Sequence, residues 1–199
     1  MFQCVILAGG FGTRLKSVSG DIPKPMVPIG NEPFLYLLMR KLEQQGCSKI
    51  ILSLHYKADF IINRIDSDRP VSCPVEYSVE DLPLGTGGAL KRSSRLISEP
   101  RFIALNGDTY CDIDYASLLI AAESTDLLVA AVNVDNVQRY GKLEIDDTSA
   151  VLSMGEKSME GEGFINAGTY VIKTDDIAKF SMEEFSFEND FIPVNVKSC

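Results

Sequence analysis

The sequence has little of what membrane, secreted and nucleic-acid-binding proteins require. No apolar run in the 199 residues approaches the roughly 18 that a membrane-spanning helix needs, so no span is expected. Basic residues number 19 against 28 acidic ones, a net charge of −9, which argues against a nucleic acid as partner. The start MFQCVILAGG has no basic region and passes directly into a strand-like run, so it is not expected to be a signal peptide.

Histidine and paired cysteines are also scarce. The five cysteines are widely scattered and include no CxxC pair: Cys4, Cys47, Cys73, Cys111 and Cys199. A zinc site and a disulfide framework are therefore both disfavoured, and reduced thiols in a cytoplasmic protein are expected. The one histidine, His55, follows a strand-like run, and we expect it to be hydrogen-bonded and partly buried rather than a ligand.

The length and composition of the chain indicate one globular domain, and the sequence has no repeats, low-complexity stretches or linkers. Short β-branched runs alternate with helical segments. Strands are expected at 2–8, 49–55, 75–79, 102–105 and 127–134, and helices at 33–45, 58–65, 87–97 and 115–123. Because the run Leu127–Val134 is almost continuously apolar, it is expected to be a central strand covered on both faces. The cluster of Phe180, Phe185, Phe187 and Phe191 is expected to pack in the core.

This alternation predicts an α/β fold, a mostly parallel sheet with helices on both faces. After about residue 140 the pattern changes to strands separated by turns, at 142–145, 151–154 and 165–172, which predicts a small β-rich extension. We therefore expect a single domain, with a first part over about 1–135 and a second over about 136–199. In such sheets the ligand binds at the carboxyl ends of the strands.

The first strand runs into Gly9-Gly10-Phe11-Gly12, whose glycines let backbone N–H groups approach a phosphate. Arg14 then adds a forked cation suited to phosphate oxygens. The loop is no Walker A motif, because it has no Gly-Lys, and no Rossmann fingerprint, because Leu15 stands at the third glycine position. Ten residues after Arg14, two prolines bracket Lys24 and reduce the entropy lost when it is presented to a ligand.

Together these motifs resemble the sugar-1-phosphate nucleotidyltransferases. The similarity begins with LAGGFGTRL and PKPMVPI and continues in the family's order through LGTGGA (84–89), NGD (106–108), RYG (139–141), EK (156–157) and NAG (166–168). Within the family, PKPMVPI, PLGTGGAL, RYGKLEID and GFINAGTY are most similar to bacterial D-glycero-α-D-manno-heptose 1-phosphate guanylyltransferases. The resemblance implies a Rossmann-like three-layer αβα sandwich, the nucleotide-diphospho-sugar transferase fold, with a mostly parallel mixed sheet.

The resemblance also implies a reaction. A sugar 1-phosphate would join the α-phosphorus of a nucleoside triphosphate, GTP in the heptose enzymes, with Mg²⁺ as cofactor and pyrophosphate as leaving group. Its nucleophile is a phosphate oxygen that is already anionic, so the protein must supply charge neutralisation and positioning rather than a general base. The expected partners are these two substrates, and a homo-oligomer stays open. The product would be an activated sugar for lipopolysaccharide or capsule.

The roles that the resemblance assigns fall into three sets. Nucleotide binding is assigned to Leu7, Ala8, Gly9, Gly10, Gly12, Thr13, Arg14, Gly85, Thr86 and Gly87, with backbone donors from the helix N-terminus that follows Gly85. Sugar binding is assigned to Asn106, Gly141, Glu156, Lys157, Asn166 and Gly168. Catalysis is assigned to Arg14, Lys24 and Asp108, with Asp108 also the metal ligand. Nearby, Asp112 and Asp114 are expected in turn and capping roles.

One family feature has no counterpart in the sequence. The family carries a later Asp-Ile-Gly-Thr-Pro-like segment, whose aspartate is the second Mg²⁺ ligand, and the match stops before it at Cys199. Two hypotheses follow, an active enzyme with Asp108 and extra water ligands, or a sugar-nucleotide-binding remnant with little catalysis. Physical reasoning on the sequence does not distinguish guanine from the other bases, so a uridylyl- or thymidylyltransferase for another sugar 1-phosphate also stays open.

Overall fold

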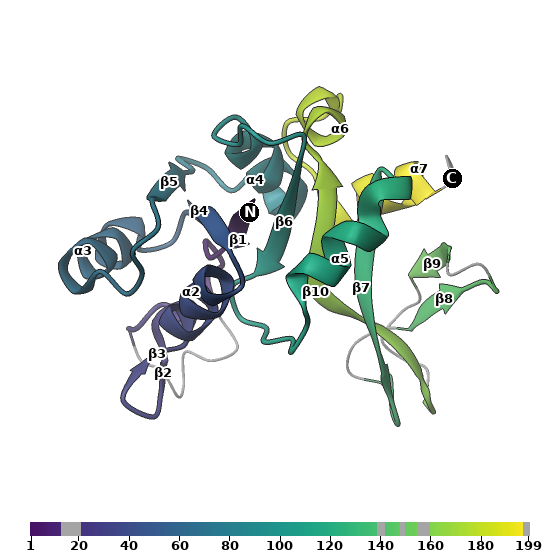
Figure 1. Cartoon of the computed structure of the whole chain (residues 1–199), viewed down its shortest axis with the longest axis horizontal. Coiled ribbons are helices and arrows are strands. Elements are labelled where there is room, and N and C mark those ends of the chain that lie inside the picture. The colour runs from purple at the N-terminus through teal and green to yellow at the C-terminus, as the bar shows by residue number, and fades with distance from the viewer. Residues whose placement is uncertain (13–20, 139–141, 148–149, 155–159, 197–199) are drawn as a thin grey trace.

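The fold is described from a computed structural model, which covers residues 1–12, 21–138, 142–147, 150–154 and 160–196. Its main sheet has eight strands, seven of them in the order β5-β4-β1-β6-β10-β8-β9, with β7 pairing to β10 (Figure 1). The parallel part consists of β1 (Phe2–Leu7), β4 (Cys47–Leu54), β5 (Val75–Val79) and β6 (Arg101–Asn106). The antiparallel part consists of β7 (Leu127–Val134), β8 (Leu143–Ile145), β9 (Val151–Met154) and β10 (Gly163–Lys173). A separate two-stranded sheet joins β2 (Pro28–Ile29) and β3 (Glu32–Pro33).

Helices cover both faces of the sheet because β1 sends alternate side chains into two separate cores. Cys4 and Ile6 belong to the core that includes residues of α2 (Phe34–Gln44), α3 (Ala58–Asp68) and α5 (Tyr115–Ala121). Val5 belongs to the opposite core, with residues of α4 (Gly85–Ser94), α6 (Thr174–Lys179) and α7 (Ile192–Val196). Short helical turns complete the described elements: η2 (Lys24–Met26), η3 (Ala122–Ser124) and the π-helical η4 (Phe187–Phe191). The predicted αβα sandwich with a mixed sheet is confirmed.

The prediction of a central strand over Leu127–Val134 is wrong. The segment is a strand, but in the described residues β7 pairs with β10 alone, and antiparallel. Its first half lies against the part of β10 inside the core, whereas its second half extends outward beside Gly163–Asn166, where Val132 is 42% exposed. An apolar run shows that a strand is favourable, but it does not show how many neighbours the strand will have.

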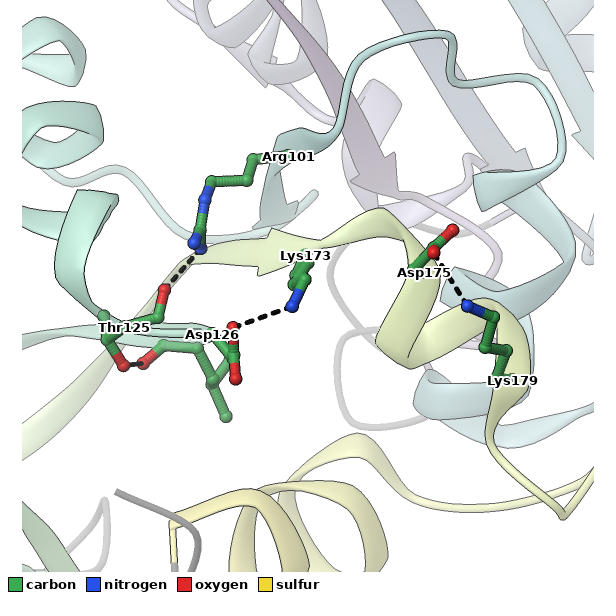
Figure 2. A network of polar contacts seen from close by, with 7 residues as sticks. Arg101, Thr125, Asp126, Lys173, Asp175 and Lys179 are labelled. Carbon is green, nitrogen blue, oxygen red and sulfur yellow. Dashed lines mark hydrogen bonds and ion pairs between the residues drawn. The ribbon is translucent and has the colours of Figure 1, made fainter.

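β10 joins the β-rich part of the chain to the main sheet. Phe164 pairs with β8, whereas Thr169–Lys173 pair with β6. Figure 2 shows how the far end of β10 is held: Lys173 bonds to Asp126 at 3.1 Å, while Arg101 donates to the carbonyl of Thr125. These contacts lie where β6 begins, so they tie the antiparallel strands to the body at the edge opposite the carboxyl end of β6.

Two further observations bear on the sequence predictions. The four phenylalanines Phe180, Phe185, Phe187 and Phe191 pack on one another and on the second core, as predicted, with ring centroids 4.6 to 6.5 Å apart. Within the described part of the chain, every helix falls short of the length and apolarity needed to cross a bilayer.

Candidate active site

A cavity of about 520 Å³ opens at the carboxyl ends of the parallel strands. β1 lies between β4 and β6, and the chain passes from β1 first to one side and later to the other, so the cavity sits at a topological switch point. Ten of the predicted site residues line it: Leu7, Ala8, Gly9, Gly10, Gly12, Lys24, Gly85, Thr86, Asn106 and Asp108. Thr13, Arg14, Gly141, Glu156 and Lys157 lie outside the described residues.

The glycine loop after β1 is shaped by close backbone approaches. A Cβ at Gly9 would lie 2.9 Å from the backbone nitrogen of His55, so only glycine lets the ends of β1 and β4 meet there. Gly12 has φ +59°, and a Cβ on it would lie 3.1 Å from the Cβ of Lys24. Gly10 has no such neighbour within 4 Å, which leaves its backbone accessible from the cavity that it lines. The first two predicted motifs therefore meet in space.

An aromatic group that the sequence analysis left without a role supports this loop. The ring of Phe11 packs edge-on against His55, with centroids 5.4 Å apart, and against Tyr56 at 5.6 Å. His55 is itself held by a 2.9 Å hydrogen bond between its Nδ1 and the carbonyl oxygen of Glu80. His55 is thus hydrogen-bonded and partly buried as predicted, and it also lines the cavity together with Phe11 and Glu80.

Lys24 and Asp108, which are 84 residues apart, form an ion pair at the cavity wall. Lys24 begins η2 between the two prolines, and Asp108 follows the end of β6. Their side chains are 37% and 38% exposed. A solvated pair of this kind contributes only about 0 to 1 kcal/mol. Substrate phosphates and a cation can therefore replace the two partners at little cost.

The loop that carries Asp108 is anchored to α2. Lys41, whose side chain is 10% exposed, donates to the carbonyl of Cys111 at 2.7 Å and to the carboxylate of Asp112 at 2.9 Å. This ammonium lowers the pKa of Asp112, first through the hydrogen bond and then through its charge. Asp114 accepts from the backbone of Ala116 and caps α5, as expected of it, whereas the contact seen for Asp112 is its ion pair with Lys41.

The donor set for a metal is small. Among the described residues, no three or more His, Cys, Asp or Glu side chains come together to hold an ion. Asp108 is the carboxylate beside Lys24, and its second oxygen accepts from the hydroxyl of Thr109 at 3.3 Å. Mg²⁺ commonly takes one or two carboxylates and completes its shell with substrate phosphates and water. As a single carboxylate at the cavity wall, Asp108 is compatible with a cation of that kind.

Two glycines of the third motif are packed against a segment that lies far away in the chain. The N–H groups of Gly87 and Gly88 both donate to the carbonyl of Phe185, at 3.0 and 3.4 Å, so they are not available to a nucleotide. A Cβ at Gly87 would overlap the ring of Phe185. Gly85 and Thr86 line the cavity, but Gly87 is covered by the segment that contains Phe185. The prediction of free donors at this helix N-terminus is wrong for these two glycines.

The described residues of the predicted sugar side gather around Asn106. Gly168 has φ +66°, and a Cβ on it would lie 2.7 Å from the Nδ2 of Asn106. Asn166 accepts from the N–H of Gly168 at 2.8 Å and donates to the hydroxyl of Tyr170 at 2.7 Å. β6 and β10 therefore bring these residues together beside the cavity, which Asn106 lines.

Two carboxylates in the cavity wall were missed by the sequence analysis. Glu80 follows β5 and is 7% exposed, accepting from the hydroxyl of Ser53 at 3.3 Å and the N–H of Leu84 at 3.0 Å. Its place at the end of a predicted strand, just before PLGTGG, could have marked it as a site residue. The carboxyl ends of parallel strands lie at one edge of the sheet, where the ligand binds. Glu188 belongs to η4, about a hundred residues later, and had no local signal.

Comparison with known proteins decides the family. The protein-family model described as nucleotidyl transferase matches residues 3–194. The chain belongs to this family. The predicted sugar-1-phosphate nucleotidyltransferase is thereby confirmed as a family and as a class of enzyme, since curated relatives of that class also match along almost the whole chain.

Three similar proteins place this nucleotidyltransferase within the family. A D-glycero-α-D-manno-heptose 1-phosphate guanylyltransferase from Campylobacter jejuni is 38% identical over 98% of the chain and 86% of the relative. The same enzyme from Aneurinibacillus thermoaerophilus is 38% identical over 96% and 83%. The crystal structure of HddC from Yersinia pseudotuberculosis is 52% identical and superposes with a TM-score of 0.91, over 97% of this chain and 86% of that one. HddC has also been solved in complex with GMP-PN.

Proposed function

We propose that this protein transfers a guanylyl group from GTP to a sugar 1-phosphate and releases pyrophosphate. The sugar that we favour is D-glycero-α-D-manno-heptose 1-phosphate, and the product would serve the assembly of a surface glycan, with the reaction in the cytoplasm. One observation carries the proposal: a single cavity has a buried carboxylate, Glu80, on its β5 side and the Lys24–Asp108 pair on its β6 side. The similarity to two heptose guanylyltransferases and to HddC supports the choice of base and sugar.

The two ends of the cavity suit a nucleotide lying across the strand ends. Glu80 and Asp108 follow strands that are separated by β4 and β1, so three strand spacings, roughly 14 Å, lie between them. The carboxylate of Glu80 has capacity beyond its two present bonds, because it offers about four acceptor sites. Guanine presents N–H donors at N1 and N2 on one edge. A buried acceptor at this position therefore favours guanine over a base that presents an acceptor there.

At the phosphate end, the residues position and neutralise two anions. An oxygen of the sugar phosphate attacks the α-phosphorus while the bond to the β-phosphate breaks, and no proton needs to be removed from the nucleophile. Lys24 would leave Asp108 and donate to the phosphates, and the accessible backbone around Gly10 would approach them. Asp108 would hold Mg²⁺, which supplies charge neutralisation between the substrates when bound.

The test is pyrophosphate release with Mg²⁺, crossing four nucleoside triphosphates with heptose 1-phosphate, mannose 1-phosphate and glucose 1-phosphate. We expect a strong signal for GTP with the heptose. Turnover confined to UTP or dTTP would overturn the guanine assignment. Turnover confined to mannose 1-phosphate or glucose 1-phosphate would overturn the proposal that the heptose 1-phosphate is the substrate. A protein that binds GTP but is silent with all three sugars would overturn the transfer reaction itself.

Substituting Glu80→Gln is expected to lower kcat/KM for GTP by about 10- to 100-fold, because one charged acceptor is lost from the base. ITP, which lacks the exocyclic amine of guanine, isolates the contact. The wild type should prefer GTP to ITP by about tenfold or more. In the variant this preference should shrink towards one.

The neighbouring Asp81 is exposed, and Asp81→Asn provides the control, expected to keep the wild-type preference. A GTP-to-ITP ratio that stays the same in the Glu80→Gln variant would show that Glu80 does not contact the base.

A further inference from the structure

Glu188 is a carboxylate that none of the motifs above assigns, and it is held inside the wall of the cavity. Its Oε2 accepts from the hydroxyl of Thr86 at 2.8 Å, and its Oε1 accepts from the hydroxyl of Tyr170 at 3.4 Å. Thr86 comes from the start of α4 and Tyr170 from β10. Glu188 thus lies between the nucleotide-side turn and the strand that carries the predicted sugar-side residues.

The position of Glu188 is fixed by the packing of its neighbours. The preceding Phe187 is fully buried, with its ring 4.9 Å from that of Tyr170 and 5.2 Å from that of Phe191. The N–H of Phe187 donates to the Thr86 hydroxyl at 2.9 Å, so this hydroxyl accepts from the backbone and donates to Glu188. The side chain of Ser186 caps the start of η4 by accepting from the N–H of Asn189. The carboxylate is therefore presented to the cavity by a constrained segment.

Within the residues that the structure describes, the hydrogen-bond partners of Glu188 are neutral hydroxyls. Among the ion pairs between described residues, none involves Glu188. It accepts hydrogen bonds from the hydroxyls of Thr86, Tyr170 and Ser186. Burial, and then the negative charge of Glu188, raise the pKa of the Tyr170 hydroxyl, which therefore stays protonated and able to donate. A carboxylate without a paired cation repels phosphates but accepts strong, charge-assisted hydrogen bonds from hydroxyl groups.

A nucleotide-sugar reaction offers two sources of hydroxyls, the ribose and the ring of the sugar 1-phosphate. The shorter bond of Glu188 comes from Thr86 on the nucleotide side, whereas the contact of its Oε1 with Tyr170 points to the second source. Tyr170 accepts from Asn166 at 2.7 Å while it donates to Glu188, so one chain of polar contacts joins Glu188 to the sugar-side strand. Within the described part of the chain, the Oε1 atom has only the 3.4 Å contact with Tyr170, which leaves it acceptor capacity for a ligand.

We propose that Glu188 accepts a hydrogen bond from a ring hydroxyl of the sugar 1-phosphate and so helps to select the sugar. The inference rests on the proposed function, because it needs a sugar 1-phosphate as substrate. It adds an anionic acceptor to the cavity from the segment after β10, which none of the sequence motifs above covers.

The experiment combines Glu188→Gln with deoxy analogues of the sugar 1-phosphate that the wild-type protein uses. For the wild type, removal of the contacted hydroxyl should lower kcat/KM by about 10- to 100-fold. Glu188→Gln should lower kcat/KM for the parent sugar by a similar factor. It should then show almost no further loss with that one analogue, whereas analogues deoxygenated elsewhere keep their wild-type penalties. The KM for GTP should change by less than about twofold, since the base contact is unaltered.

Glu184→Gln is the matched control, because Glu184 is an exposed carboxylate of the same segment and lies outside the main cavity wall. In this control, each deoxy analogue should lower kcat/KM by the same factor as in the wild type. Glu188→Asp, which keeps the charge on a shorter side chain, provides a second variant if Glu188→Gln is poorly folded in thermal unfolding. It should also reduce the penalty of the same single analogue.

Three outcomes would contradict the proposal. If each deoxy analogue lowers kcat/KM by the same factor in the Glu188 variants as in the wild type, Glu188 acts only on the fold. If instead the wild type loses kcat/KM with 2′-deoxy-GTP and the Glu188→Gln variant does not, the contact belongs to the ribose. Failure of the wild type to turn over any sugar 1-phosphate would overturn the proposed function and this inference with it. Turnover by the wild type, with the same loss for every deoxy analogue in the variants, would overturn this inference alone.

Discussion

Asp108→Asn is expected to lower Mg²⁺-dependent turnover by on the order of 10²- to 10³-fold, the range seen when one electrostatic contact to a transition state is removed. The amide nearly matches the carboxylate in shape but carries no charge to hold a cation between two anionic substrates. The fold should be unaffected, because Asp108 is 38% exposed and its pair with Lys24 is solvated.

The measurement is the rate of pyrophosphate release against Mg²⁺ concentration, together with the binding of Mn²⁺ to the protein in the presence of GTP. The variant should require far more metal and bind Mn²⁺ more weakly, while its thermal unfolding matches the wild type. Asp112→Asn is the control, since Asp112 belongs to the same loop, is 92% exposed and pairs with Lys41 instead. Wild-type turnover and metal binding in the Asp108→Asn variant would rule out Asp108 as the ligand.

Gly85→Ala is expected to lower the free energy of unfolding by about 2 to 4 kcal/mol. Gly85 has φ +73°, which strains any residue with a Cβ. A Cβ there would also overlap the carbonyl oxygen of Phe185 and lie 2.9 Å from its carbonyl carbon. These are backbone atoms in the segment that covers the start of α4, so relief requires that segment to move away.

Denaturant unfolding of the variant measures this cost, and Gly30→Ala separates its two causes. Gly30 has φ +65°, close to that of Gly85, but a Cβ on it would meet nothing within 4 Å. Its substitution should therefore cost only the backbone strain, about 1 to 2 kcal/mol. Equal costs at the two positions would mean that the contact with Phe185 contributes nothing to stability.

Much of the site could be predicted because it follows from local patterns. The strand before Gly9 and the strand before Asp108 are read from short apolar runs, and parallel strands place their carboxyl ends at one edge. Lys24 is presented between two prolines, which is also a local feature. These residues meet at the cavity as predicted, with Gly12 adjacent to the side chain of Lys24.

The errors arise where the outcome depends on residues far away in the chain. The run Leu127–Val134 indicates a strand, but its place at one side of β10 depends on the pairing of β10 with β6. The glycines after Gly85 are predicted to approach the base and ribose of a nucleotide at a helix start. The carbonyl of Phe185, about a hundred residues later, instead accepts from the N–H groups of Gly87 and Gly88.

The sequence by itself predicted the fold class, because strand periodicity and turn chemistry are local. The resemblance of its motifs to the family, and not periodicity, predicted the roles of Lys24 and Asp108. The tertiary structure alone decided which further carboxylates face the cavity. Glu80 is buried against Ser53, and Glu188 reaches Thr86 across 102 residues. Contacts at such separations depend on how distant elements pack and leave no periodic signal in the chain, so only the folded protein reveals them.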